Sequence, residues 1–345
     1  MSRPPGAAAI YEEFADRRTL AKILVGFAVA IVLVYFLGVL VGLGSVREAL
    51  ARADVRWLAV ACVSTLIGLA AWGKAWQVVL AVVGIEVRYR RLVVTYLSAT
   101  FANYITPFGQ AGGEPFIAYV LSQDTGASYE DSLASVVIAD LLNLLPFFNF
   151  AALGLAVLVV RAELPDVIRP LAFGLAGVAV AVPAIAYVGW NHRDGVERWL
   201  LRAIGPLVDR TERFSVDGVR RRIDRFYESL EVIAAEPREL AYALVFSYAG
   251  WLFFALPLYV AALTLGLRIE PLLVLFIVPA STIAGFVPTP GGLGGVETAL
   301  VVLLVALAPL GGGEAFAVAT IYRVASYWFA LVAGGLATIY VVARA

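Results

Sequence analysis

Two short stretches of the sequence repeat one unusual combination of residues. Residues 106–114 read TPFGQAGGE and residues 289–297 read TPGGLGGVE, so that five of the nine positions agree. Each stretch interrupts strongly apolar sequence with glycine and proline, which disfavour a continuous helix. A helix that starts at such a break presents free backbone N–H groups and the positive end of its dipole, which attract anions. These two stretches, called the cassettes below, therefore predict anion-binding helix ends.

The cassettes supply most of the candidate binding residues. Their glycines permit positive φ angles and the close approach of a headgroup. Each cassette ends in a glutamate at the expected start of the next helix, where a carboxylate either caps the first turn or contacts a substrate or coupling cation. The sequence leaves both roles open. The candidates are Thr106, Gly112, Gly113 and Glu114 in the first cassette, and Thr289, Gly291, Gly292, Gly294, Gly295 and Glu297 in the second.

Four further polar residues lie within apolar segments: Lys74, Asp140, Asn143 and Arg323. A charge at the centre of a membrane helix costs about 2.5–3.5 kcal/mol on insertion scales, so such residues usually have a function. Lys74 can alternatively extend its amine to the membrane surface. Asp140 and Arg323 each follow the Thr of a cassette by 34 residues. We expect Arg323 to anchor an anion and Asp140 to hold it in the empty site; a permanent structural ion pair is the alternative.

Composition identifies the class of protein. The 345 residues are 61% hydrophobic and 15% charged, which is too apolar for a soluble chain of this length. The apolar runs are continuous and do not alternate, which predicts an all-α polytopic membrane protein and not a β-barrel. A formal net charge of zero gives no reason to expect a nucleic-acid partner. With one cysteine and one histidine, we expect no catalytic centre, metal or cofactor.

The apolar segments predict eight membrane elements. Six are long enough to cross a bilayer, and two are interrupted in mid-course by the cassettes, so we expect these two to enter and leave by the same face. The six full spans are 20–43, 57–84, 132–160, 167–190, 238–263 and 315–342, and the two re-entrant regions are 92–121 and 271–308.

Arginine placement orients these elements. Segment 191–237 is rich in arginine, which favours the cytoplasmic side, and the same rule places the N-terminus there. Counting the membrane elements from that side places the C-terminus in the cytoplasm too. The two re-entrant regions then enter from opposite faces, which is the pattern of an inverted repeat. We expect a first half at 1–190, a connector at 191–237 and a second half at 238–345, forming one membrane domain. Chance similarity between two Gly/Pro-rich loops remains the alternative.

The connector itself has a helical apolar stripe. Its apolar residues recur at intervals of three and four, whereas arginines occupy the opposite face, which predicts an amphipathic helix on the inner membrane surface or against the bundle. The apolar positions are Val216, Val219, Ile223, Phe226, Leu230 and Ile233, and the arginines are Arg220, Arg221, Arg222 and Arg225.

Several of these motifs resemble one known family. VPTPGGLGGVETALV at 287–301 with YRVASYW at 322–328 is similar to the lysylphosphatidylglycerol synthase transmembrane-region family, also called flippase-like membrane proteins. ITPFGQAGGEPF at 105–116 and GKAWQVVL at 73–80 fit the same family. The resemblance covers essentially the whole chain and implies a stand-alone membrane domain without the aminoacyl-transferring domain. Many relatives carry Glu-Arg and then Asp where this chain has Ala139, Asp140 and Asn143, which leaves the charge of the substrate open.

The resemblance implies a lipid translocase of a prokaryotic cell membrane, archaeal or from a GC-rich bacterium. The expected partner is a membrane lipid, either an anionic phospholipid or a polyprenyl-phosphate-linked sugar, and a homo-oligomer is left open. Two alternatives also remain. One is a secondary transporter of a small anionic solute, which shares the inverted-repeat logic. The other is a membrane glycosyltransferase acting on polyprenyl phosphate, although the connector is small for a nucleotide-sugar site.

Overall fold

The structure is a computed structural model that describes residues 51–105, 127–160, 169–193, 216–286, 289–308 and 310–342, together with single residues between and before these ranges. All elements in these ranges are helices. Four helical stretches are long and apolar enough to cross a membrane: 55–82, 129–158, 237–264 and 312–341. They match four of the six expected spans, and the prediction of an all-helical membrane protein is confirmed.

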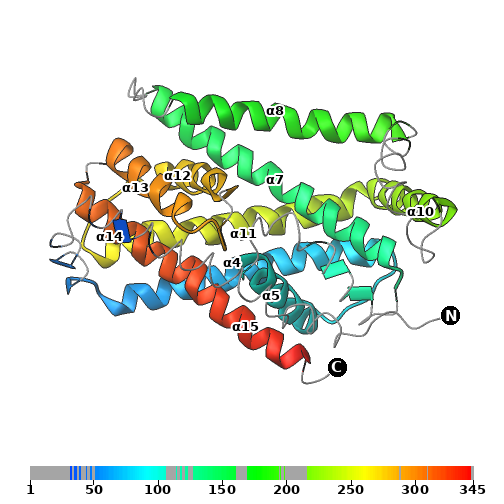
Figure 1. Cartoon of the computed structure of the whole chain (residues 1–345), viewed down its shortest axis with the longest axis horizontal. Coiled ribbons are helices and arrows are strands. Elements are labelled where there is room, and N and C mark those ends of the chain that lie inside the picture. The colour runs from blue at the N-terminus through cyan, green and yellow to red at the C-terminus, as the bar shows by residue number, and fades with distance from the viewer. Residues whose placement is uncertain are drawn as a thin grey trace.

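Two antiparallel helices form the centre of the molecule, α4 (Val55–Val82) and α11 (Pro237–Thr264) (Figure 1). They approach closely because glycines face each other at the contact. A Cβ added to Gly68 would lie 3.0 Å from the carbonyl oxygen of Gly250, and one added to Gly250 would lie 2.4 Å from Cδ1 of Trp72. Small residues give membrane helices this kind of close van der Waals contact.

Helices from the two halves of the chain pack against each other in two pairs. Helix α5 (Tyr89–Ile105) packs against α15 (Phe329–Val342), and α12 (Pro271–Ile283) packs against α7 (Tyr129–Val160). Glycine marks the closest approach in both pairs. A Cβ on α15's Gly334 would lie 2.4 Å from a carbonyl oxygen of α5, and a Cβ on α7's Gly154 would lie 2.5 Å from a Cβ of α12.

The second cassette joins two short helices, α12 and α13 (Gly295–Leu307). Each has 13 residues, which gives about 20 Å of helix, less than the roughly 30 Å of a hydrocarbon core. Helix α14 (Gly312–Arg323) follows, and a π-helical segment at Val324–Trp328 joins it to α15. In Figure 1, α12, α13 and the start of α14 gather at the end of the molecule opposite α10.

Two helices lie outside the central group. Helix α8 (Arg169–Asn191) runs along the outside of α7 and exposes large apolar side chains such as Phe173 and Val180, as expected for a surface in contact with lipid (Figure 1). Helix α10 (Val216–Ala234), within the predicted connector, packs on α7 with Ile233 fully buried. The expected span at 20–43 lies largely outside the described residues. The total number of spans therefore stays a prediction.

Candidate functional site

A buried ion pair connects the second cassette to the helix that follows it. Nε of Arg323 donates to Oε1 of Glu297 at 2.6 Å, and Nη2 of Arg323 donates to the carbonyl oxygen of Gly291 at 3.1 Å. The Arg323 side chain is 11% exposed and the Glu297 side chain 7%. Arg323 is the last residue of α14, and Glu297 lies in the first turn of α13. Two sequence candidates thus meet in one site.

The cassette folds to this geometry because three of its glycines adopt left-handed backbone conformations. Gly291, Gly292 and Gly294 have φ angles of 57°, 64° and 86°, a region that other L-residues rarely occupy. The turn is closed by a hydrogen bond from the Thr289 hydroxyl to the carbonyl oxygen of Leu293, at 2.8 Å. This turn brings the Gly291 carbonyl and the start of α13 to the same side, facing Arg323.

Glu297 has two roles at once. Its Oε2 accepts a hydrogen bond from the backbone N–H of Gly294 at 2.6 Å, which caps the first turn of α13, while its Oε1 accepts from Arg323. The capping bond fixes the carboxylate in position, and the second oxygen then orients the guanidinium. The two roles left open by the sequence are therefore compatible, because each uses a different oxygen.

A tyrosine that the sequence analysis did not select completes the site. The guanidinium carbon of Arg323 lies 4.4 Å from the ring centroid of Tyr327, a cation–π contact. Tyr327 is 1% exposed, and its hydroxyl donates to the carbonyl oxygen of Tyr104 on α5 at 3.2 Å. The four-residue spacing is no reliable signal for this contact, because it places two residues on one face only in a regular α-helix, and the segment after Arg323 is π-helical. Without the structure, Tyr327 is one more aromatic residue of a membrane helix.

The site has the chemistry of an anion-binding centre. A guanidinium carries five N–H donors, and the contacts described here use two of them. The remaining donors suit a phosphate group, which guanidinium groups bind with two parallel hydrogen bonds. Glu297 neutralises the charge of Arg323 meanwhile, so that no isolated charge is buried.

Asp140 does not hold Arg323, which differs from our expectation. Its Oδ1 instead accepts a hydrogen bond from Nε1 of Trp76 at 3.3 Å, and Glu114 is its electrostatic neighbour. The spacing is the same in both halves: Glu114 precedes Asp140 by 26 residues, as Glu297 precedes Arg323. Arg323 thus pairs with the glutamate of its own cassette, and Asp140 has Glu114 as an electrostatic neighbour, so the two equivalent positions do not pair with each other.

The other candidates have separate partners. Asn143 accepts a hydrogen bond from the hydroxyl of Ser247 through its side chain, and through its carbonyl one from Nε1 of Trp251 at 2.8 Å. These bonds fasten α7 to α11. Lys74 donates to Oε1 of Gln77 at 2.7 Å, and its amine lies 5.6 Å from the ring of Tyr89.

Three candidates of the first cassette cannot be placed. Thr106, Gly112 and Gly113 lie outside the described residues, whereas Glu114 is helical and partly buried. In the second cassette, Gly295 begins α13. No cluster of His, Cys, Asp or Glu suited to a metal ion occurs in the part of the chain that the structure describes.

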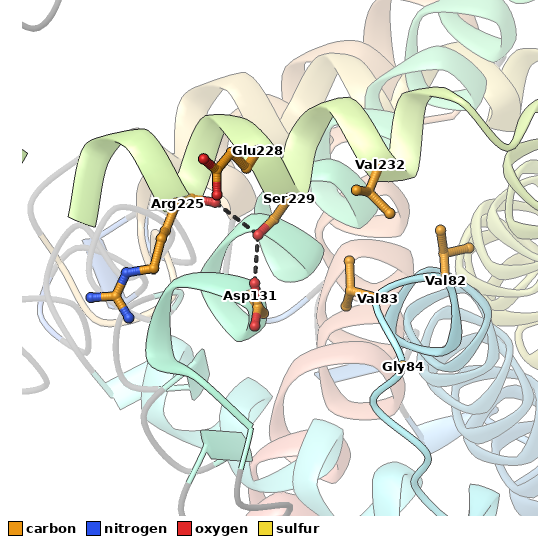
Figure 2. A pocket seen from close by; sticks show the side chains of 8 residues that line it. All are labelled: Val82, Val83, Gly84, Asp131, Arg225, Glu228, Ser229 and Val232. Atoms are coloured by element: carbon orange, nitrogen blue, oxygen red, sulfur yellow. Dashed lines mark hydrogen bonds between the residues drawn. The ribbon is translucent and has the colours of Figure 1, made fainter. Parts of the chain in front are cut away.

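A pocket of about 480 Å³ lies where α10 meets the end of α4 and the start of α7 (Figure 2). Two polar contacts lie in its lining or beside it. The Ser229 hydroxyl donates to Oδ1 of Asp131 at 2.5 Å, and Nη2 of Arg225 lies 3.3 Å from Oε1 of Glu130. These bonds tie α10 to α7. The pocket thus marks where the connector is attached to the bundle, and it is separate from the Arg323–Glu297 site.

Known proteins with similar sequences are archaeal membrane proteins. A "UPF0104 membrane protein" of Methanothermobacter thermautotrophicus is 28% identical over 335 residues, which cover 94% of this chain and 94% of that protein. A second protein with this name from the same organism is 28% identical over 296 residues, covering 84% of this chain and 86% of its own length.

A more distant relative carries the name of an enzyme. The "Glycosyltransferase AglD" of Haloferax volcanii is 26% identical over 297 residues, which cover 80% of this chain but 47% of that protein. More than half of that protein has no counterpart in the matched region. The family described as "Lysylphosphatidylglycerol synthase TM region" matches residues 23–334, and the chain belongs to this family, as its motifs predicted.

Proposed function

We propose that this protein moves a lipid with a phosphate group between the two leaflets of a membrane, with Arg323 as the phosphate anchor. The observation that carries the proposal is the buried Arg323–Glu297 pair at a broken helix inside an apolar bundle. A charged pair in such a place costs desolvation energy and is better explained as part of a substrate path than as a source of stability.

The exchange of one anion for another gives the pair its function. In the empty site, Glu297 satisfies Arg323. An entering phosphate binds the free donors of the guanidinium and draws it away from Glu297, and Glu297 keeps its capping bond to the backbone N–H of Gly294, so that α13 stays capped. The site therefore never holds an unpaired arginine, which would cost several kcal/mol.

Alternating access would come from an inverted repeat. The reciprocal packing of α5 on α15 and of α12 on α7, around the antiparallel α4–α11 pair, supports two halves of opposite orientation. In this proposal α12 and α13 form a re-entrant hairpin that enters from the outer face, and the first cassette enters from the cytoplasmic face.

Cysteine labelling tests this topology. Glu86 and Arg268 are exposed residues in the loops after α4 and α11, and Cys62→Ser provides a cysteine-free background. A membrane-impermeant thiol reagent applied to intact cells should label Arg268→Cys but label Glu86→Cys only after lysis. Labelling of both from outside would rule out the proposed orientation.

The substrate class follows from the shared chemistry of two lipids. An anionic phospholipid and a polyprenyl-phosphate-linked sugar both present a phosphate on an apolar chain, and Arg323 would bind that phosphate. Lipid mass spectrometry of the purified protein separates them, because each would be retained with its own mass.

Transport in liposomes is the direct test. Wild-type protein should move fluorescent phosphatidylglycerol or a polyprenyl-phosphate sugar out of reach of a membrane-impermeant quencher. Arg323→Gln should slow this by about tenfold or more, because hydrogen bonds to charged groups contribute roughly 1.5–3 kcal/mol each. The matched control is Arg268→Gln, which removes an exposed arginine and should leave the rate unchanged.

Other results would point to the alternatives. Uptake of inorganic phosphate, without lipid movement, would indicate a solute transporter. Transfer of sugar from a nucleotide sugar to polyprenyl phosphate would indicate an enzyme. Equal lipid transport by wild type and Arg323→Gln would refute the role of Arg323.

A further inference from the structure

We propose that Tyr327 is a positioning residue that couples the Arg323 anion site to the first half of the chain. This inference rests on the proposed function and extends it. It names the residue through which anion binding at the second cassette affects α5, the helix that precedes the first cassette. Tyr327 is almost fully buried and contacts groups from three elements: Arg323 of α14, Gly291 of the second cassette and Tyr104 of α5.

The ring of Tyr327 forms one wall of the anion site. A Cβ added to Gly291 would lie 2.0 Å from Cε2 of Tyr327, so the ring lies directly against the glycine backbone. The carbonyl oxygen of that same glycine accepts the hydrogen bond from Nη2 of Arg323. The guanidinium is therefore held by the ring on one face, by the Gly291 carbonyl and by Glu297. Its remaining donors are left for a ligand.

The hydroxyl of Tyr327 reaches the first half of the chain. It donates to the carbonyl oxygen of Tyr104, and the two rings lie 4.9 Å apart with 31° between their planes. Tyr104 is the next-to-last residue of α5 as the structure describes it. α5 ends at Ile105, directly before the first cassette begins at Thr106.

The π-helical segment directs Tyr327 toward both partners. Residues 324–328 have the wider π-helical turn, which places one more residue in the turn than an α-helix does. Each residue of an α-helix advances by about 100° around the axis, so removing that extra residue would turn Tyr327 away from Tyr104. Such segments are often found at functional sites, and here it begins directly after Arg323.

The contacts give a direct route for coupling. When phosphate binds the free donors and draws the guanidinium away from Glu297, the guanidinium moves relative to the Tyr327 ring that stacks on it. The same ring carries the hydroxyl that holds the end of α5, so a shift of the ring changes the hold on α5. Occupied and empty sites thus differ in a contact between the two halves, which is the kind of differential contact that a conformational step requires.

Tyr327→Phe isolates the coupling, because it removes the hydroxyl and keeps the ring on Arg323 and Gly291. Binding is measured by titrating short-chain phosphatidylglycerol into detergent-purified protein and following tryptophan fluorescence, since Trp328 lies 5.1 Å from the Tyr327 ring. Transport is measured in liposomes. We expect affinity within about twofold of wild type and a transport rate lower by about fivefold, the effect of one net hydrogen bond.

Tyr327→Leu and Tyr242→Phe complete the experiment. Tyr327→Leu also removes the wall of the site and should weaken binding by about fivefold as well as slow transport, because the cation–π contact is lost. Tyr242 is a matched control: it also follows an arginine by four residues and stacks on it, at 5.8 Å, but is exposed on α11. Tyr242→Phe should bind and transport as wild type does.

The outcomes separate this inference from the function on which it rests. If Arg323→Gln is slow but Tyr327→Phe transports at the wild-type rate, the coupling role is refuted and the anion site stands. If Tyr327→Phe loses affinity and rate in equal proportion, the hydroxyl serves binding alone and the inference also fails. Should Tyr327→Phe lower the Tm strongly, Tyr104→Leu, which removes the ring contact between α5 and Tyr327, must show the split between affinity and rate.

Discussion

Arg323 and Glu297 are 26 residues apart in the chain, and their side chains meet at 2.6 Å between the end of α14 and the start of α13. The same interval separates Glu114 from Asp140 in the first half, where both residues are acidic. The two halves thus share a spacing but not a charge pattern. Among the residues that the structure describes, a buried cation beside a cassette glutamate is found in the second half, which is why the proposed anion site is placed there.

The buried pair should show strong coupling in a double-mutant cycle. Arg323→Gln and Glu297→Gln should each lower the free energy of unfolding by about 3–5 kcal/mol, because each leaves a buried charge without its partner. The double variant should lose less than the sum, since no unpaired charge remains. Thermal or denaturant unfolding in detergent measures this, and strictly additive losses would contradict the pairing.

Gly291 should tolerate alanine much less well than Gly266. Both have positive φ angles, 57° and 70°, so both substitutions carry a backbone strain of roughly 1–2 kcal/mol. At Gly266 nothing lies within 4 Å of the added Cβ, whereas at Gly291 the Tyr327 ring is in its way. Gly291→Ala should therefore lose about 1–3 kcal/mol more, the usual cost of overpacking. Equal Tm values for the two variants would show that the ring does not occupy this position.

The α4–α11 crossing should depend on Gly250. Alanine there places its Cβ 2.4 Å from Trp72, and the two helices must separate or the indole must move. We expect Gly250→Ala to cost about 1–3 kcal/mol. Gly177→Ala on α8 is the control, because nothing lies within 4 Å of its Cβ and alanine favours a helix by roughly 0.5–1 kcal/mol. The prediction fails if the two substitutions shift the Tm in the same direction.

The attachment of α10 should depend on Ser229 more than on the exposed pair beside it. Ser229→Ala removes the hydrogen bond to the Asp131 carboxylate (Figure 2). It should lower the free energy that holds α10 on α7 by about 1.5–3 kcal/mol, the usual contribution of a hydrogen bond to a charged group. Glu231→Gln breaks the ion pair between Glu231 and Arg193, whose side chains are 56% and 62% exposed, respectively. It should change the stability of α10 little. Hydrogen exchange of residues 216–234 measures the difference; equal protection in both variants would contradict it.

The sequence by itself determined the class and the family, and it selected three of the residues that the structure brings together. Hydrophobic length fixes membrane helices almost without tertiary information, because lipid leaves the backbone no other way to satisfy its polar groups. That is why the expected spans at 57–84, 132–160, 238–263 and 315–342 lie within a few residues of the observed helices. The repeated cassette selected Gly291 and Glu297, and the charge within an apolar segment selected Arg323, because glycine breaks and charges are costly inside a membrane helix.

Only the tertiary structure decided which residues meet. Sequence spacing showed that Asp140 and Arg323 occupy equivalent positions, but equivalence under a repeat does not imply contact. In the folded protein Arg323 pairs with Glu297, because the left-handed turn at Gly291–Gly294 directs the start of α13 toward the end of α14. Tyr327 belongs to the site because a π-helical turn directs it there and because it contacts Tyr104, 223 residues away in the chain. Neither feature can be recognised from the local composition. Contacts between distant segments depend on how whole helices pack, and that information lies in the fold.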